Sequence, residues 1–151
     1  MTGTATEDTL SREERASLLA RALPEELEPL AEETLARKGD PVVLSGPEVG
    51  MVMMQVREPV AAERFYLGEV LVTRTEVELG GHRGWCMRLG DDRQAALAAA
   101  ILDAAAEAPD GADRASVEAL CRRVAEREAR AARAEWAEIA PTEVRFEELD
   151  S

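Results

Sequence analysis

The chain has 151 residues, of which 46% are hydrophobic and 32% are charged, a balance typical of one folded domain. Its 31 acidic and 18 basic residues give a formal net charge of -13, which repels nucleic acid and anionic lipid heads at long range. We therefore expect neither nucleic acid nor a membrane as a partner.

The N-terminal stretch MTGTATEDTLSREE has neither the basic nor the apolar region of a secretion signal, and no run approaches the roughly 18 apolar residues of a membrane span. These features predict a cytoplasmic protein, with residues 1–10 disordered and residues 11–151 folded as a single domain. Cys86 and Cys121 form no CxxC pair, so we interpret both as buried thiols.

A helical hairpin is predicted at the N-terminal end. Ser11 is followed three residues later by Glu14, and this capping-box pattern starts a helix. Pro24 suits the first turn of a second helix, which we expect to end at Gly39.

The next part of the chain is extended. Turn-forming residues Ser45 to Pro47 are predicted to divide its first stretch into two strands. The longest run, from Arg64 to Leu79, is predicted to continue through a turn at Gly80 and Gly81 into a returning strand that ends at Leu89. The sequence therefore predicts an antiparallel sheet.

Glu69 is a carboxylate in an apolar half-strand. Phe65, Leu67 and Leu71 share its face by the period of two, and the residues on the opposite face are apolar too, so we expect something to cover this half. A buried carboxylate needs a partner, which leaves an ion pair or backbone hydrogen bonds within the fold, a contact with another subunit, or direct catalysis. Gly68 beside it would let another backbone approach closely.

Two helices are predicted to follow the sheet. The first is capped by Asp91 or Asp92, and the second runs from Asp113 towards Ile139, where Pro141 stops it. The stretch TEVRFEEL then alternates apolar and charged residues, as a short terminal strand does. The fold class is therefore α+β: an N-terminal helical hairpin, an antiparallel β-sheet, two C-terminal helices and a short terminal strand.

The residue inventory for catalysis is small. His82 is the single histidine and sits in a Gly-Gly-His-Arg-Gly turn, where a solvated side chain is more common than a general base. His82 and Cys86 have no third soft ligand nearby in sequence, which argues against zinc. We interpret the methionine cluster at 51–54 as core packing rather than as a binding surface.

Three segments resemble successive blocks of a known family. They are PEVGMVMMQVRE (47–58), ERFYLGEVLVTRTEVEL (63–79) and GHRGWCMRLGDDRQAALAAAILDA (81–104), and their order and spacing are similar to those of PhnG, a small subunit of the bacterial carbon-phosphorus lyase system. The resemblance takes in the N-terminal helix and, more loosely, the pattern of residues 142–146. Its most specific residues are Phe65, Gly68, Glu69, Thr73, Arg74, Gly84, Leu89, Gly90 and Asp103.

The resemblance implies an accessory role in the use of phosphonates as a phosphorus source. It implies PhnH, PhnI, PhnJ and an ATP-binding-cassette-type PhnL subunit as partners. In that family the group of PhnG, PhnH, PhnI and PhnL replaces the adenine of ATP with methylphosphonate, giving alpha-D-ribose 1-methylphosphonate 5-triphosphate. Base displacement is expected in PhnI and the later carbon–phosphorus cleavage in PhnJ, so we expect no catalytic residue, metal or cofactor in this chain.

The alternative is an independent small enzyme or ligand-binding domain that uses Glu69, Arg74 and His82. Under the accessory hypothesis, the free chain exposes apolar surface along the alanine-rich second half of its last helix and along strand residues 65–70, and a partner or a second copy covers that surface. The candidate functional or interface residues are Phe65, Gly68, Glu69, Thr73, Arg74 and Trp136.

Overall fold

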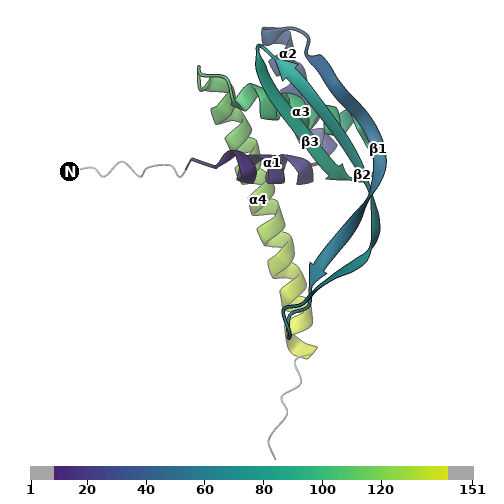
Figure 1. Cartoon of the computed structure of the whole chain (residues 1–151). Helices are drawn as coiled ribbons and strands as arrows, with labels where there is room; N and C mark the ends of the chain where they lie inside the picture. Colours follow the sequence, from purple (N-terminus) through teal and green to yellow (C-terminus); the bar gives the residue numbers. More distant parts are fainter. Residues whose placement is uncertain (1–8, 143–151) are drawn as a thin grey trace, which may run out of the picture.

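The described residues form four α-helices and one antiparallel sheet, and the α+β prediction is confirmed (Figure 1). The computed structural model describes residues 9–142. The predicted terminal strand and most of the stretch predicted to be disordered, residues 1–8, lie outside them. The elements are α1 (Arg12–Arg21), α2 (Pro24–Lys38), β1 (Val42–Arg57), β2 (Arg64–Leu79), β3 (His82–Leu89), α3 (Arg93–Ala106), α4 (Ala112–Ile139) and the 3₁₀ turn η1 (Ala140–Thr142).

The predicted helix caps are confirmed. The Ser11 hydroxyl accepts a hydrogen bond from the Glu14 N–H at 3.2 Å, and the Glu14 carboxylate accepts one from the Ser11 N–H at 2.8 Å. Of the two candidate aspartates before α3, Asp92 is the cap, since its carboxylate accepts the Ala95 N–H at 2.9 Å. Gly39 caps α2 with a positive φ. Local sequence signals therefore set these helix ends.

Helix α3 is the centre of the molecule, because it packs on β2 and β3 with one side and contacts α1, α2 and α4 with the others. Every residue from Ala98 to Ala106 is buried. A Cβ added at Gly84 of β3 would lie 2.1 Å from the Ala100 carbonyl oxygen, so only glycine lets the helix lie this close to the strand. The largest apolar side chains of the surrounding core are Leu19, Leu27, Val77, Leu102, Val117, Leu120 and Val124.

Strand β1 is one strand, so the prediction of two strands is wrong. The pairing of β1 with β2 shifts register near Ser45 and again before Glu48. Between these two residues lies a cis Gly46–Pro47 peptide, and β1 pairs with β2 on either side of it. The Ser45 carbonyl oxygen accepts a hydrogen bond from the Thr75 hydroxyl at 3.0 Å. Because cross-strand partners satisfy this backbone, the irregularity is a bulge in one strand and not a turn between two.

Two parts of the molecule project beyond this core. The sheet order is β1-β2-β3, but β3 pairs only with the Val72–Leu79 half of β2. The other half of β2 continues with β1 as a two-stranded ribbon, and the C-terminal half of α4 extends in the same direction (Figure 1). We call the ribbon formed by residues 51–71 the arm.

Candidate interaction surface

The arm is a β-ribbon without a third strand among the described residues. Its register runs from the pair of Met51 and Leu71 to the pair of Arg57 and Arg64. Isolated two-stranded ribbons are marginally stable in water, and an added strand or a packed face normally supports them. The arm is therefore the kind of ribbon that a further strand or a packed face would stabilise.

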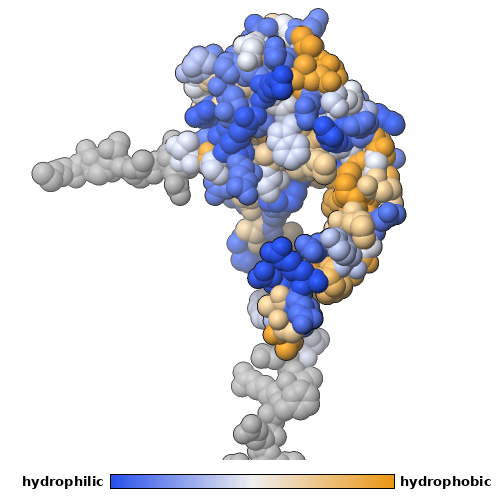
Figure 2. Space-filling view, viewed as in Figure 1, coloured by the Kyte–Doolittle hydropathy of each residue, from blue (hydrophilic) through white to orange (hydrophobic). Residues whose placement is uncertain are grey.

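The arm exposes large apolar side chains. Met51 and Met53 are 56% and 59% exposed, so the interpretation of these methionines as core is wrong. The reason is that the part of β2 opposite them lies beyond the reach of β3 and of the helices. Figure 2 shows hydrophobic surface over the arm and an opening between the arm and α4. The other exposed apolar residues of the arm are Val60, Phe65, Tyr66, Leu67 and Leu71.

The tip of the arm has a defined turn. The Glu58 carboxylate accepts hydrogen bonds from the backbone N–H groups of Ala61 and Val60, and the Glu58 N–H donates to the Glu63 carbonyl oxygen at 2.8 Å. The backbone hydrogen bond from Ala61, followed by that from Val60, lowers the pKa of Glu58 because both favour the charged carboxylate. The ribbon is thus held closed at its end.

Glu69 lies on the arm and is exposed to solvent. It stands opposite Met53, and no hydrogen bond or ion pair joins its carboxylate to another described residue. The hypothesis of an internal partner therefore finds no support in the described part of the chain. Gly68 next to it has a φ of 154° at a bulge, where Met54 faces Gly68 and Gln55 faces Tyr66.

Thr73 and Arg74 lie where β2 joins the three-stranded sheet. The buried Thr73 hydroxyl donates to the Gly90 carbonyl oxygen at 2.8 Å and fixes the loop between β3 and α3. The Arg74 guanidinium pairs with Glu76 at 3.1 Å on the sheet face opposite α3. Thr73 therefore stabilises the fold, whereas Arg74 remains open to solvent.

The structure does not bring Glu69, Arg74 and His82 together. Arg74 lies five positions beyond Glu69 on one strand, about 17 Å at the usual rise, and His82 pairs with Leu79 at the far end of that strand. Side chains this far apart cannot act on one substrate atom. The geometry therefore gives no support to an active site built from these three residues.

The C-terminal half of α4 is the second exposed surface. Val124 is the last buried residue of the helix, and every described residue after Glu128 is exposed. Trp136 is 68% exposed and Ile139 lies one turn further on. The prediction that the free chain exposes apolar side chains on this half of the helix and on residues 65–70 is confirmed; what covers them stays a prediction.

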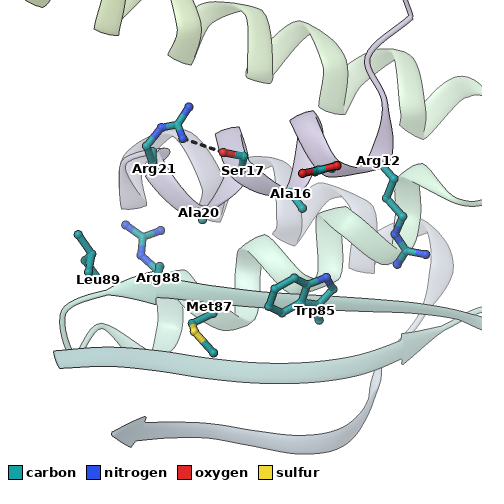
Figure 3. A pocket seen from close by; sticks show the side chains of 10 residues that line it. Arg12, Ala16, Ser17, Ala20, Arg21, Trp85, Met87, Arg88 and Leu89 are labelled. Carbon is teal, nitrogen blue, oxygen red and sulfur yellow. Dashed lines mark hydrogen bonds between the residues drawn. The ribbon is translucent and has the colours of Figure 1, made fainter. Parts of the chain in front are cut away.

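A groove between α1 and β3 was not predicted from the sequence. It has a volume of about 790 Å³ and lies between the small residues of α1 and the side chains of Trp85, Met87, Arg88 and Leu89 (Figure 3). The alternation of these β3 residues was visible in the sequence, but not that α1 stands beside them. We call it the α1–β3 groove.

The described residues contain no group of three or more histidines, cysteines or acids arranged to hold a metal ion. Among the helices of the part described, none is long and apolar enough to cross a membrane. Cys86 and Cys121 are free and buried, as predicted, and burial raises the pKa of each thiol to about 11.

The family model described as "Phosphonate metabolism protein PhnG" matches residues 10–150. The chain belongs to the PhnG family. It is also 40% identical over 136 residues to the alpha-D-ribose 1-methylphosphonate 5-triphosphate synthase subunit PhnG of Rhizobium meliloti (strain 1021), covering 89% of this chain and 85% of that protein.

Seven of the nine residues that carry the family resemblance fall into two groups in space, and the other two, Arg74 and Leu89, are exposed on the three-stranded part of the sheet. Thr73, Gly84, Gly90 and Asp103 hold the sheet, its loop and α3 together, and the buried Asp103 carboxylate accepts the Trp85 N–H at 3.1 Å. Phe65, Gly68 and Glu69 lie on the arm and make no comparable contacts within the described chain. The first group explains the fold, and the second marks the arm as the candidate interaction surface.

Proposed function

We propose that this chain is an accessory subunit of the synthase that makes alpha-D-ribose 1-methylphosphonate 5-triphosphate from ATP and methylphosphonate. The observation that carries the proposal is its 40% identity, over most of both chains, to a PhnG subunit of that synthase. The family match over residues 10–150 supports the same assignment.

The geometry supports a role in assembly. The arm and the C-terminal half of α4 present exposed apolar side chains, and their neighbours include Glu69, a carboxylate that pairs with no residue in the described range 9–142. Exposed apolar patches with polar neighbours are typical of protein–protein interfaces. In this proposal the partner packs against the arm, completes the ribbon and covers Phe65 and Trp136.

A PhnI-like subunit is the partner we propose for the arm, because the chemistry of base displacement is expected there. PhnH-like, PhnJ-like and PhnL-like subunits complete the assembly in this proposal. In this proposal the chain works by positioning the subunit that carries the chemistry.

Reconstitution tests this function. Purified PhnG-, PhnH-, PhnI- and PhnL-like subunits from one source would be mixed with ATP and methylphosphonate, and the product followed by phosphorus NMR. We expect the ribose methylphosphonate triphosphate only when this chain is present together with the others. Turnover by this chain alone, or full turnover without it, would contradict the proposal; the first outcome would favour an independent enzyme.

A further inference from the structure

Strand β1 forms the outer border of the sheet, and part of its backbone edge is open. The sheet order is β1-β2-β3, and no described element pairs with β1 on its outer side (Figure 1). Edge strands present unpaired N–H and C=O groups, which proteins usually protect with charges, proline or bulges. Pro47 and the register shifts around it protect the first part of β1 in this way. From Val49 to Val56 the strand has no charged residue and no proline, so this stretch is the accessible edge.

Hydrogen bonds at both ends of the arm show which residues of β1 face outwards. At the base, the Gly90 N–H donates to the Leu71 carbonyl oxygen at 2.9 Å, so Leu71 and the residue opposite it, Met51, direct their backbones away from each other. At the tip, the Glu58 N–H donates to the Glu63 carbonyl oxygen, which gives the same alternation along β1. Within residues 9–142 no hydrogen bond reaches the backbone groups of the outward residues. These are Val49, Met51, Met53, Gln55 and Arg57.

We propose that the β1 edges of two copies of this chain pair as antiparallel strands around a twofold axis at Met53. In this register Met53 faces its own counterpart. Met51 then faces Gln55 of the second copy. Val49 likewise faces Arg57 of the second copy. All the outward residues exchange backbone hydrogen bonds, and the two arms form one four-stranded sheet. Sheets of three or more strands are far more stable than isolated ribbons, so the pairing gives each arm the support that it lacks in the monomer.

Two prolines determine the register. Pro47 and Pro59 lack a backbone N–H, and each lies two residues outside one end of the outward set, so both are equally far from Met53 along the sequence. A shift of the axis by two residues in either direction would bring one proline into the pairing and remove hydrogen bonds. The register centred on Met53 therefore uses the whole open edge and neither proline.

The edge is complementary to itself, and this is why we assign it to a second copy. Met53 is 59% exposed and faces an identical side chain, and no like charges meet between Val49 and Arg57. Because a twofold pair uses the same patch on both copies, one open edge supplies both halves of the interface. Beyond this stretch Glu48 would meet Glu58 of the second copy, so the pairing ends there. The faces of the arm and the outer edge of β2 stay open to a PhnI-like subunit, and the inference does not rest on the proposed function.

Cysteine crosslinking tests the register in the full chain. Met53→Cys places two thiols across the axis with Cα atoms about 5.5 Å apart, within the range of about 4.4–6.8 Å that a disulfide spans. Met51→Cys is the matched control, because it changes the same residue type on the same strand face, but its two thiols lie about 13 Å apart along the strands. Cys86 and Cys121 are buried and do not compete.

Under mild oxidation we expect the Met53→Cys chain to form a covalent dimer and the Met51→Cys chain to form little. No covalent dimer through position 53, or equal amounts from the two variants, would overturn the proposal.

Oligomeric state provides a second test. Analytical ultracentrifugation of the wild-type chain should show a monomer–dimer equilibrium. Glu69 lies opposite Met53 within each copy, so Met53→Glu would align four carboxylates across the paired arms and should weaken the dimer tenfold or more. Met51→Glu should weaken it less, because it faces Gln55 of the second copy. Met53→Lys chains should bind Met53→Glu chains more tightly than the latter bind one another. A wild-type chain that is monomeric at every concentration, or a Met53→Glu chain that dimerises as the wild type does, would contradict the self-pairing of β1.

Discussion

The environment of Glu69 differs from the one that its strand pattern predicts. The sequence places it on an apolar strand face, where a carboxylate needs a partner, but the arm is open and water solvates its charge. Thr73, four residues along the same strand and on the same face by periodicity, is completely buried. Glu69 and Thr73 share a strand face by the period of two, but one is exposed on the arm and the other is buried in the three-stranded part of the sheet.

We expect Glu69→Ala and Thr73→Val to separate these roles. Glu69→Ala should change the free energy of unfolding by less than about 0.5 kcal/mol, because the carboxylate is exposed and has no partner between residues 9 and 142. Thr73→Val should cost about 1–3 kcal/mol, because it leaves the Gly90 carbonyl oxygen without its donor. Urea denaturation of both variants measures the difference. A strongly destabilised Glu69→Ala chain would reveal an internal partner for the carboxylate.

Cys86 and Cys121 should be unreactive in the folded protein. Burial raises the pKa of each thiol to about 11, because the thiolate is poorly solvated there. The stability linked to this shift is complete below pH 9 and is lost as the pH rises through 11. Alkylation at pH 8 should therefore proceed only as fast as unfolding, and added urea should accelerate it. Rapid alkylation of the native chain would contradict the burial of both thiols.

At the scale of elements, signals local to the sequence predicted most of the fold. Capping residues set the starts of α1 and α3, and the period of two identified the strands. The continuity of β1 was missed because Ser45 to Pro47 carry turn chemistry, whereas pairing with β2 decides that the strand continues. The exposure of Met51 was missed because it depends on where β3 ends, and the period of β1 contains no such information.

The tip of the arm should loosen when the Glu58 carboxylate is removed. Glu58→Ala eliminates the acceptor for the Val60 and Ala61 N–H groups, so the NMR resonances of these two amides should shift towards random-coil positions. In the wild type the same change should occur as the pH falls through the lowered pKa of Glu58, because the tip's hydrogen bonds need the charged form. Glu63→Ala is the control, since only the backbone of Glu63 takes part in the turn. Unchanged amide shifts in Glu58→Ala would show that the tip does not depend on this carboxylate.

Trp136 should contribute to association and not to folding. Its ring is 68% exposed on a part of α4 that no other described element covers, so Trp136→Ala should leave the melting temperature within about 1 °C of the wild type. A buried aromatic at an interface commonly contributes about 2 kcal/mol or more, so association with the PhnI-like subunit should weaken at least tenfold. A destabilised Trp136→Ala chain with unchanged association would remove this residue from the interface.

The described part of the molecule separates a buried core from two projecting elements. The helices and the three-stranded half of the sheet bury the core, while the arm and the end of α4 extend from it with their apolar side chains exposed (Figures 1 and 2). This arrangement could be predicted in outline, because the sequence showed an apolar half-strand and a helix with few large side chains to cover it. The α1–β3 groove could not, because it depends on the tertiary position of α1 beside β3.

The most direct test of the account is the affinity of the full chain for the PhnI-like subunit when the arm loses its apolar surface. Phe65→Ser with Leu67→Ser changes two exposed arm residues, and Val42→Ser with Leu44→Ser makes a matched change at the exposed start of β1. By isothermal titration we expect the arm variant to lose at least tenfold in affinity at an unchanged melting temperature, and the control to bind as the wild type does. Full affinity of the arm variant would contradict the claim that the arm is the surface on which the partner assembles.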